Sequence, residues 1–306
     1  MEIYGWMRTV PLGGDFPLPT SEWSYLEHQA AFSGVIPFSG YKLQGIGSWS
    51  RAESYDNEWA RSLPDQAHAA GQVYAPAVGV TQAALQAVLG NRDVWSAAAD
   101  NLLALMDDWD AVVYDALDTP AELTDANGDF VLALSTAVRQ AGKPFWLSVC
   151  GTNWDDPMSF PLPVAEQAAD LLIYYCYGWW VQPRMVSPYW WVKQSIDFAL
   201  TQGLVPSRTV LGCALYSTWW ETHGGVRHDM THAQAVEIAH AHNARVEWLE
   251  NSASGLVRER VADTGTGYIA LTDGSTLRHR LDLAREYELR GAMLFTPGLE
   301  SQDVWG

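Results

Sequence analysis

Residues 187–220 read SPYWWVKQSIDFALTQGLVPSRTVLGCALYSTWW. Within this stretch, the segment 191–203 has apolar residues at three- and four-residue spacing and ends in Gly203, which predicts a helix. The run TVLGCALY (209–216) that follows is short, apolar and flanked by turn residues, which predicts a buried strand. A helix that leads into a buried strand is the repeating unit of α/β folds.

The same alternation of strands and helices extends over the whole chain. Seven further strand-like runs occupy residues 2–7, 34–38, 72–79, 110–116, 144–150, 170–177 and 291–296. Longer segments with helical spacing lie at 81–106, 129–142 and 275–291. Strands that alternate with helices pair in parallel through right-handed crossovers, and eight such units are the count of a TIM (β/α)8 barrel. An open doubly wound sheet is the alternative, but no Gly-rich nucleotide loop follows the first strand. We therefore predict the α/β class and a single barrel over residues 1–306.

One connection, between the seventh strand and the last helix, is much longer than a usual loop of this fold. It contains a predicted helix at 231–243, with Thr231 as its N-cap, and strand-like pieces at 245–250 and 267–271. We predict a small α+β insertion at about residues 217–274, placed over the C-terminal face where the active sites of such barrels lie.

Composition limits the classes of partner. The 306 residues are 48% hydrophobic and 18% charged, with a net charge of −18. Phosphate binding needs clustered Lys and Arg, so nucleic acid is not an expected partner, and neither is an anionic membrane surface. No apolar run approaches the roughly 18 residues of a membrane span, and the N-terminus MEIYGWMRTV has no signal-peptide pattern. We expect no membrane insertion. The expected location is the cytoplasm, or a site reached by a non-classical route such as delivery with a virion.

Cysteine and histidine give no sign of a cofactor. Cys150, Cys176 and Cys213 each end a strand-like run, which predicts buried reduced thiols rather than a disulfide framework. His228 and His232 would share a helix face, but no third ligand has convincing spacing. We predict neither a metal nor a cofactor.

Aromatic residues are frequent, with 16 Trp and 13 Tyr. Three tryptophan doublets, at 179–180, 190–191 and 219–220, fall in predicted loops or at helix starts, where core packing explains them poorly. Aromatic faces at such places suit sugar rings or protein interfaces. A glycan is the partner we expect, with protein partners through the aromatic loops as the alternative.

The stretch 187–220 resembles glycoside hydrolase family 18, the chitinase family. It is most similar to the branch that contains bacterial spore-germination and cortex-lytic N-acetylglucosaminidases. The resemblance rests on a loop Ser-Pro, a helix and a strand that ends LG-x-x-x-Y-x-x-x-W, here Leu211, Gly212, Tyr216 and Trp220. Residues 231–250 and 267–295 resemble the insertion, penultimate helix and last strand of that branch. The first half agrees in layout, and the resemblance covers nearly the whole chain.

The family's catalytic motif is altered here. Its fourth strand carries Asp-Gly-x-x-x-Asp-x-Glu, whose Glu is the general acid, while the neighbouring Asp steadies the substrate's N-acetyl group. Asp110 matches the first Asp, Ala111 the Gly and Asp115 the last Asp, but Leu117 stands at the position of the Glu. Leucine cannot donate a proton. The next residue, Asp118, would replace it only if a bulge turned its side chain inward.

Two other site positions differ. The family's sixth strand has Met-x-Tyr-Asp, where this chain has Tyr175-Cys176-Tyr177-Gly178, and the Trp of the eighth strand is Phe295. The resemblance implies Asp118, Asp115 and Tyr177 as catalytic candidates. It further implies a set of substrate-binding candidates: Trp6, Asp110, Tyr175, Trp179, Tyr216, Trp220 and Phe295.

Two functions remain open. The first is a glycan-interacting barrel with weakened or lost hydrolase activity, which binds an N-acetylglucosamine-containing polymer or serves as a structural or adhesion component, for instance in a virion tail. The second is an active glycosidase that cleaves peptidoglycan or chitin by substrate-assisted catalysis, with Asp118 as the acid. The altered motif favours the first.

Overall fold

The structure is a computed structural model that describes residues 1–115, 121–151, 160–178, 185–221, 225–253 and 255–306. Its centre is a ring of parallel strands in the order β1-β15-β9-β8-β7-β6-β5-β2, closed by the pairing of β1 with β2. The ring strands are β1 (Glu2–Met7), β2 (Gly34–Leu43), β5 (Ala77–Val80), β6 (Val112–Asp115), β7 (Phe145–Cys150), β8 (Leu171–Tyr175), β9 (Thr209–Ala214) and β15 (Gly291–Phe295). The predicted eight-stranded TIM barrel is confirmed.

Two short strands extend the ring on one side. β4 (Val73–Tyr74) pairs with β2 ahead of β5, because Pro76 interrupts the predicted strand 72–79. β3 (Trp49–Arg51) runs antiparallel to the end of β2, which continues to Leu43 and so exceeds the predicted 34–38.

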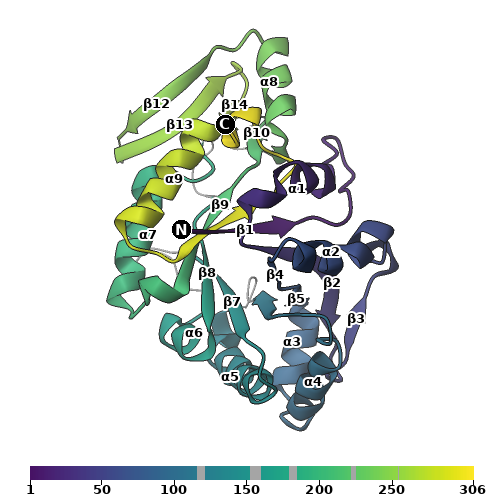
Figure 1. Cartoon of the computed structure of the whole chain (residues 1–306). Coiled ribbons are helices and arrows are strands. Elements are labelled where there is room, and N and C mark those ends of the chain that lie inside the picture. The colour runs from purple at the N-terminus through teal and green to yellow at the C-terminus, as the bar shows by residue number, and fades with distance from the viewer. Residues whose placement is uncertain (116–120, 152–159, 179–184, 222–224, 254) are drawn as a thin grey trace.

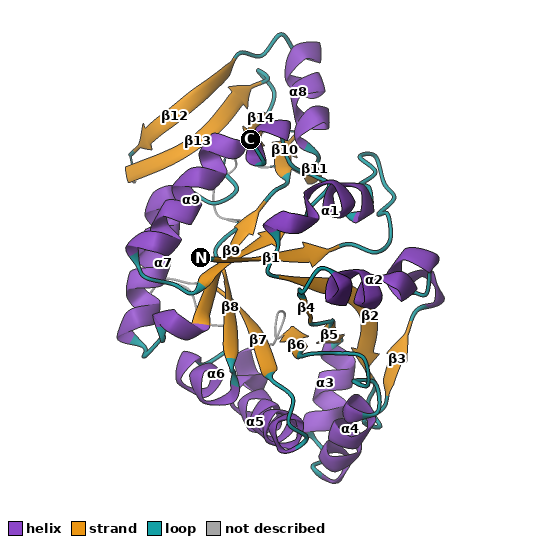
Figure 2. Cartoon of the chain, in the orientation of Figure 1, coloured by secondary structure: helices purple, strands orange, loops and turns teal. Residues whose placement is uncertain are grey.

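Helices surround the ring, as Figure 2 shows. They are α1 (Glu22–His28), α2 (Glu58–Ala69), α3 (Gln82–Leu89), α4 (Asp93–Leu103), α5 (Thr124–Gln140), α6 (Leu162–Ala168), α7 (Tyr189–Thr201) and α9 (Gly274–Glu286). Short 3₁₀ turns at 29–31, 53–55, 121–123, 206–208 and 302–304 complete the pattern. The predicted helix at 81–106 is two helices, because the chain breaks at Gly90 and Asn91 before α4 begins.

The side chains inside the ring come from alternate strand positions. In β1, Tyr4 and Trp6 belong to the interior cluster, whereas Met7 belongs to the layer between strands and helices. Both faces of each strand are therefore apolar, which explains why the strands appear in the sequence as continuous hydrophobic runs. The interior cluster consists of Tyr4, Trp6, Ile36, Ala75, Ala77, Ala111, Val113, Trp146, Leu171, Ile173, Tyr175, Val210 and Met293.

The insertion follows β9 and forms the upper part of the molecule in Figure 1. It is an antiparallel sheet in the order β11-β10-β14-β13-β12, with α8 (His232–Ala241) packed on it. Its strands are β10 (Ser217–Trp220), β11 (Arg227–Met230), β12 (Val246–Ser252), β13 (Gly255–Asp263) and β14 (Tyr268–Leu271). Thr231 and Gln234 form a capping box at the start of α8, which confirms the predicted N-cap.

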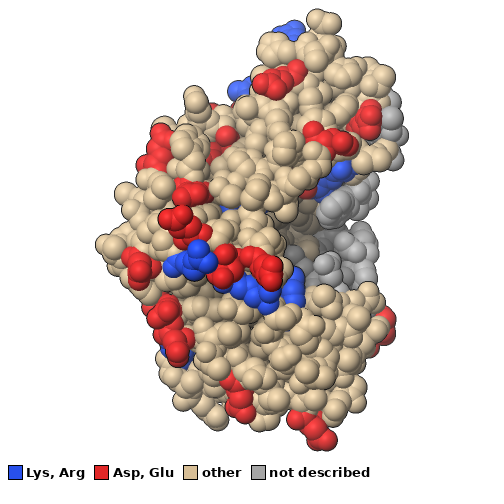
Figure 3. Space-filling model, turned by 90° about the vertical axis from the view of Figure 1, so that its right-hand side faces the viewer, with Lys and Arg blue, Asp and Glu red and all other residues tan. Residues whose placement is uncertain are grey.

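The surface agrees with the composition. Figure 3 shows acidic side chains scattered over one face among largely uncharged surface. Within the described ranges, no helix has the length and apolar character needed to span a bilayer. Cys176 and Cys213 are buried as predicted, but Cys150 is exposed, because it ends β7 at the rim of the barrel.

Candidate functional site

The centre of the barrel mouth is a carboxylate held by a buried serine. Asp115 is the last residue of β6 and is half-buried, and Ser148 lies beside it in the parallel register of β7. The fully buried Ser148 hydroxyl donates a hydrogen bond to Asp115 Oδ1 at 2.5 Å. This bond fixes the direction of the carboxylate. The sequence offered one sign of it, a single polar residue within the apolar run PFWLSVC.

Aromatic rings from several strands meet next to Asp115. Tyr177 stacks on Phe295 with 5.3 Å between ring centroids and 25° between planes. Tyr175 meets Tyr177 edge-on at 5.1 Å and Trp6 at 5.7 Å. Phe38 of β2, which the sequence reasoning missed, contacts both Trp6 (5.5 Å) and Phe295 (6.0 Å). Tyr216 joins the group at 6.1 Å from Tyr177.

These rings form a floor rather than the walls of an open cleft. Trp6 is fully buried, Tyr175 is 3% exposed and Tyr216 is 4% exposed. Tyr177, Phe295 and Asp115 keep partial exposure. A glycine on the neighbouring strand makes this packing possible, because a Cβ at Gly212 would lie 2.8 Å from the Tyr175 ring.

The phenols near Asp115 remain neutral. Burial raises the pKa of Tyr175 well above its ordinary value, and the Asp115 carboxylate raises it further. Burial, the other two tyrosines and Asp115 raise the pKa of Tyr177 in the same way. Each phenol therefore keeps its proton, and Tyr177, which keeps partial exposure, can donate a hydrogen bond to a ligand oxygen.

The insertion contributes polar groups above the rings. Arg227 of β11 donates to the Tyr216 hydroxyl at 3.0 Å and to Asp229 Oδ1 at 2.8 Å. Arg8, which follows β1, is buried, and burial lowers its pKa to about 10 although Asp229 acts in the opposite direction. No sequence signal identified these residues, because their proximity depends on how the insertion folds over the barrel.

The structure does not bring every predicted residue to this centre. Asp110 precedes β6 at the opposite end of the barrel, where it accepts hydrogen bonds from Tyr74 N (2.8 Å) and His68 Nε2 (3.0 Å). This placement removes Asp110 from the proposed substrate contacts. Trp220 is buried on β10 and, within the described part of the chain, makes no ring contact with the cluster. Leu117, Asp118 and Trp179 lie outside the described residues.

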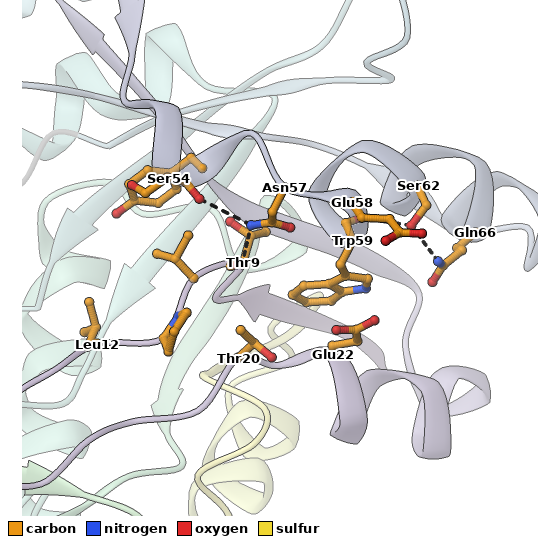
Figure 4. Close-up of a pocket in the computed structure, with 13 residues that line it drawn as sticks. Thr9, Leu12, Thr20, Glu22, Ser54, Asn57, Glu58, Trp59, Ser62 and Gln66 are labelled. Carbon is orange, nitrogen blue, oxygen red and sulfur yellow. Dashed lines mark hydrogen bonds between the residues drawn. The ribbon is translucent and has the colours of Figure 1, made fainter.

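Two hollows flank the mouth. One, of about 210 Å³, lies beside Asp115 and is bounded by Phe38, Lys42, Tyr55 and Gly79 among others. The other, of about 1010 Å³, lies between the residues that follow β1 and helix α2, and the two share Tyr55. Figure 4 shows the larger hollow.

The larger hollow contains none of the predicted site residues. In Figure 4 the Trp59 indole lies between Glu22 and Glu58, the charged residues of its lining. Asn57 donates to Thr9 O at 2.8 Å and caps α2 by accepting from Ala60 N. We assign the larger hollow to the rim of the barrel, where the hydrogen bonds of Asn57 fix the shape of the α2 N-terminus.

The histidine pair His228 and His232 does not have the arrangement that a shared helix would give it. His228 lies in a strand, so it does not share a helix face with His232, and it approaches Glu221 at 3.6 Å. No group of three His, Cys, Asp or Glu side chains that could hold a metal ion occurs within the described ranges.

Solved structures share this architecture. The spore cortex-lytic enzyme SleL of Bacillus megaterium QM B1551 superposes on 99% of this chain and 72% of its own, with a TM-score of 0.80 and 16% identity. The chitinase of Chromobacterium violaceum ATCC 12472 superposes on 99% of this chain and 96% of its own, with a TM-score of 0.83 and 15% identity. This chain has the chitinase fold. The likeness confirms the predicted barrel and, at the level of fold, the resemblance to glycoside hydrolase family 18.

Sequence comparison adds one curated relative of this chitinase-like barrel. The cortical fragment-lytic enzyme of Bacillus subtilis (strain 168) is 25% identical over 146 residues. The match spans 45% of this chain and about a third (34%) of that enzyme's length. No protein-family model matches the chain.

Proposed function

We propose that this chitinase-like barrel binds an N-acetylglucosamine-containing glycan at its mouth and hydrolyses it weakly or not at all. One observation carries the proposal. The Asp115 carboxylate, fixed by Ser148, lies with the phenols of Tyr175 and Tyr177, whereas the sequence has Leu117 at the position of the proton donor. Of the family's site residues, the Asp at position 115 and the Tyr at position 177 are retained, whereas the acid is replaced by Leu117.

Each retained group has a role in binding. The Asp115 carboxylate accepts the N–H of an acetamido group, an interaction that an ionised acceptor makes stronger than a neutral one does. The neutral Tyr177 phenol donates to a sugar oxygen. Phe295 offers an apolar face to the C–H side of the ring. Such binding without turnover suits an adhesion or structural component, for instance on a virion.

Weak hydrolysis follows from the chemistry of the leaving group. A glycosidic oxygen leaves poorly unless it is protonated, and loss of general acid catalysis typically costs about 10² to 10⁴ in rate. Gly178, which stands where the family has Asp, removes a second carboxylate.

The alternative is an active glycosidase that cleaves peptidoglycan or chitin with Asp118 as the acid. The hydrogen-bonded state of Asp115 favours it, because an oriented carboxylate is what substrate-assisted hydrolysis requires of that position. Asp is one methylene shorter than Glu, however, and a misplacement of about 1 Å can cost roughly 10²-fold in rate.

The decisive experiment compares the wild type with Leu117→Glu and Asp118→Asn. Reducing-end release from chitin oligomers and from peptidoglycan glycan strands is measured together with binding of the same glycans. We expect binding with little release by the wild type, increased release by Leu117→Glu and no effect of Asp118→Asn. Fast wild-type release that Asp118→Asn abolishes would establish the alternative. Absence of binding to either glycan would refute both functions.

A further inference from the structure

A lysine side chain, that of Lys42, lines the small hollow beside Asp115. The volume of the hollow is about 210 Å³, and Lys42 is the positively charged residue among the described residues that line it: Phe38, Gly40, Tyr41, Lys42, Ala52, Tyr55, Ala77, Val78, Gly79 and Asp115. The hollow thus combines a carboxylate, an ammonium and aromatic walls.

Strand register explains how Lys42 comes near Asp115. Lys42 of β2 lies beside Gly79 of β5. On the other side of β5, Val78 lies beside Tyr114 of β6, the residue before Asp115, and Lys42, Gly79 and Asp115 line the same hollow. A Cβ at Gly79 would lie 2.6 Å from Lys42 Nζ and 3.5 Å from its Cδ and Cε. The lysine side chain therefore extends across β5 in the space that the glycine leaves.

The Lys42 ammonium has no partner of opposite charge among the described residues. Neither an ion pair nor a hydrogen bond of its ammonium occurs there, although acids outnumber bases 36 to 18. The other two lysines both have partners. Lys143 donates to the carbonyl oxygens of Met106 (2.9 Å) and Trp109 (2.6 Å), and Lys193 forms ion pairs with Asp197 and Glu286.

A ligand that fits must present two groups close together. The Asp115 carboxylate, beside its hydrogen bond from Ser148, can accept the acetamido N–H of an amino sugar, and Lys42 can bind an anion within the same small hollow. N-acetylmuramic acid has both, because its 2-acetamido group is adjacent to a 3-O-lactyl group that ends in a carboxylate. N-acetylglucosamine has the acetamido group and a neutral 3-hydroxyl.

We propose that Lys42 makes this site specific for glycans that contain N-acetylmuramic acid with a free lactyl carboxylate, over chitin. The inference rests on the proposed glycan binding and names its substrate class. The Lys42 ammonium binds the lactyl carboxylate as a point charge. Gly79, which has no side chain, leaves the space that this ammonium occupies.

Binding of two tetrasaccharides tests the proposal. One is the peptide-free alternating N-acetylglucosamine–N-acetylmuramic acid tetramer, the other is chitotetraose, and tryptophan fluorescence gives both dissociation constants. Lys42→Met should weaken muramyl binding by about ten-fold, the loss expected for one charge-assisted hydrogen bond, and change chitotetraose binding by less than about two-fold. Lys42→Arg should retain the preference.

Two further variants test whether the position of the Lys42 ammonium matters, rather than positive charge in general. Gly79→Ala keeps the lysine but displaces its ammonium, so muramyl binding should weaken several-fold. Lys193→Met, which removes an exposed cation on α7, should change neither constant. Circular dichroism melting shows whether each variant is folded.

The outcomes are distinguishable. If the wild type binds both glycans equally, or Lys42→Met weakens both to the same extent, the muramyl specificity is refuted and the proposed function stands. If the wild type binds neither glycan, both proposals fall.

Discussion

At the scale of single residues, the contact that most affects the proposed site is the hydrogen bond from Ser148 to Asp115. A hydrogen bond to a charged group contributes about 1.5 to 3 kcal/mol, and without it the carboxylate loses its fixed direction. Ser148→Ala should therefore weaken binding of chitotetraose by about ten-fold, measured by the same fluorescence titration.

The control for this prediction is Ser135, another buried serine. Ser135 is in α5, away from the barrel mouth, and its hydroxyl donates a hydrogen bond to Ala168 O at 2.6 Å. Ser135→Ala should lower the free energy of unfolding without changing glycan affinity. Equal losses of affinity in the two variants would show that Ser148 acts only through stability.

At the scale of elements, a buried ion pair fastens the insertion to the barrel. Glu259 of β13 is 1% exposed and accepts hydrogen bonds from the backbone N–H groups of Val186 (3.1 Å) and Ser187 (2.7 Å). Arg280 of α9 approaches Glu259 at 3.2 Å and also donates to Ser187 Oγ. One carboxylate thus joins a strand of the insertion, the segment before α7 and helix α9.

Removal of this carboxylate should strongly destabilise the fold. Glu259→Ala leaves Arg280 buried without its counter-charge, a change that typically costs about 3 to 5 kcal/mol. Urea denaturation measures the loss. Glu259→Leu combined with Arg280→Met should recover part of it, since no charge is then buried alone. Asp282→Ala, which breaks an exposed pair with Arg285, should cost less than about 1 kcal/mol. A loss of that size for Glu259→Ala would contradict the role assigned to the pair.

The same scale shows why part of the fold could be predicted from the sequence. Apolar runs such as DLLIYYCY (170–177) predicted all eight ring strands, because a strand that is buried on both faces appears in the sequence as an unbroken run of apolar residues. The five-stranded sheet of the insertion was predicted only in part. β10 follows β9 so closely that the two read as one mainly apolar run. In β13, charged residues alternate with the apolar ones, so neither β10 nor β13 was recognised as a separate strand.

The site shows the same division. The family resemblance implied Trp6, Asp115, Tyr175, Tyr177, Tyr216 and Phe295 as candidates, and the convergence of strand ends in a barrel brings them into one group. Phe38, Lys42 and Arg227 were not identified. Their positions depend on how far β2 continues, on the space above Gly79 and on the fold of the insertion, none of which a residue pattern specifies.

At the scale of the whole molecule, the barrel closes where its first strand meets its last. Glu2 N donates to Arg290 O at 3.2 Å, Arg290 Nε donates to Glu2 Oε2 at 2.8 Å, and the Tyr4 hydroxyl donates to the same carboxylate. Burial raises the pKa of Glu2, but the hydrogen bonds from Arg290 and Tyr4 outweigh burial, and its pKa lies below the ordinary value of 4.5.

This shift predicts an acid-dependent contribution to stability. A carboxyl group with a lowered pKa in the folded state stabilises the protein at pH values above its unfolded pKa, and this stabilisation is lost as the pH falls through the folded pKa. The free energy of unfolding of the wild type should therefore exceed that of Glu2→Gln near neutral pH, and the difference should shrink toward acid pH. Urea denaturation of both proteins from about pH 7 to about pH 3 measures the difference. The exposed Glu53→Gln is the control and should follow the wild type throughout. A difference between wild type and Glu2→Gln that stays constant, or that grows as the pH falls, would mean that the ionised Glu2 carboxylate does not hold the first and last strands together.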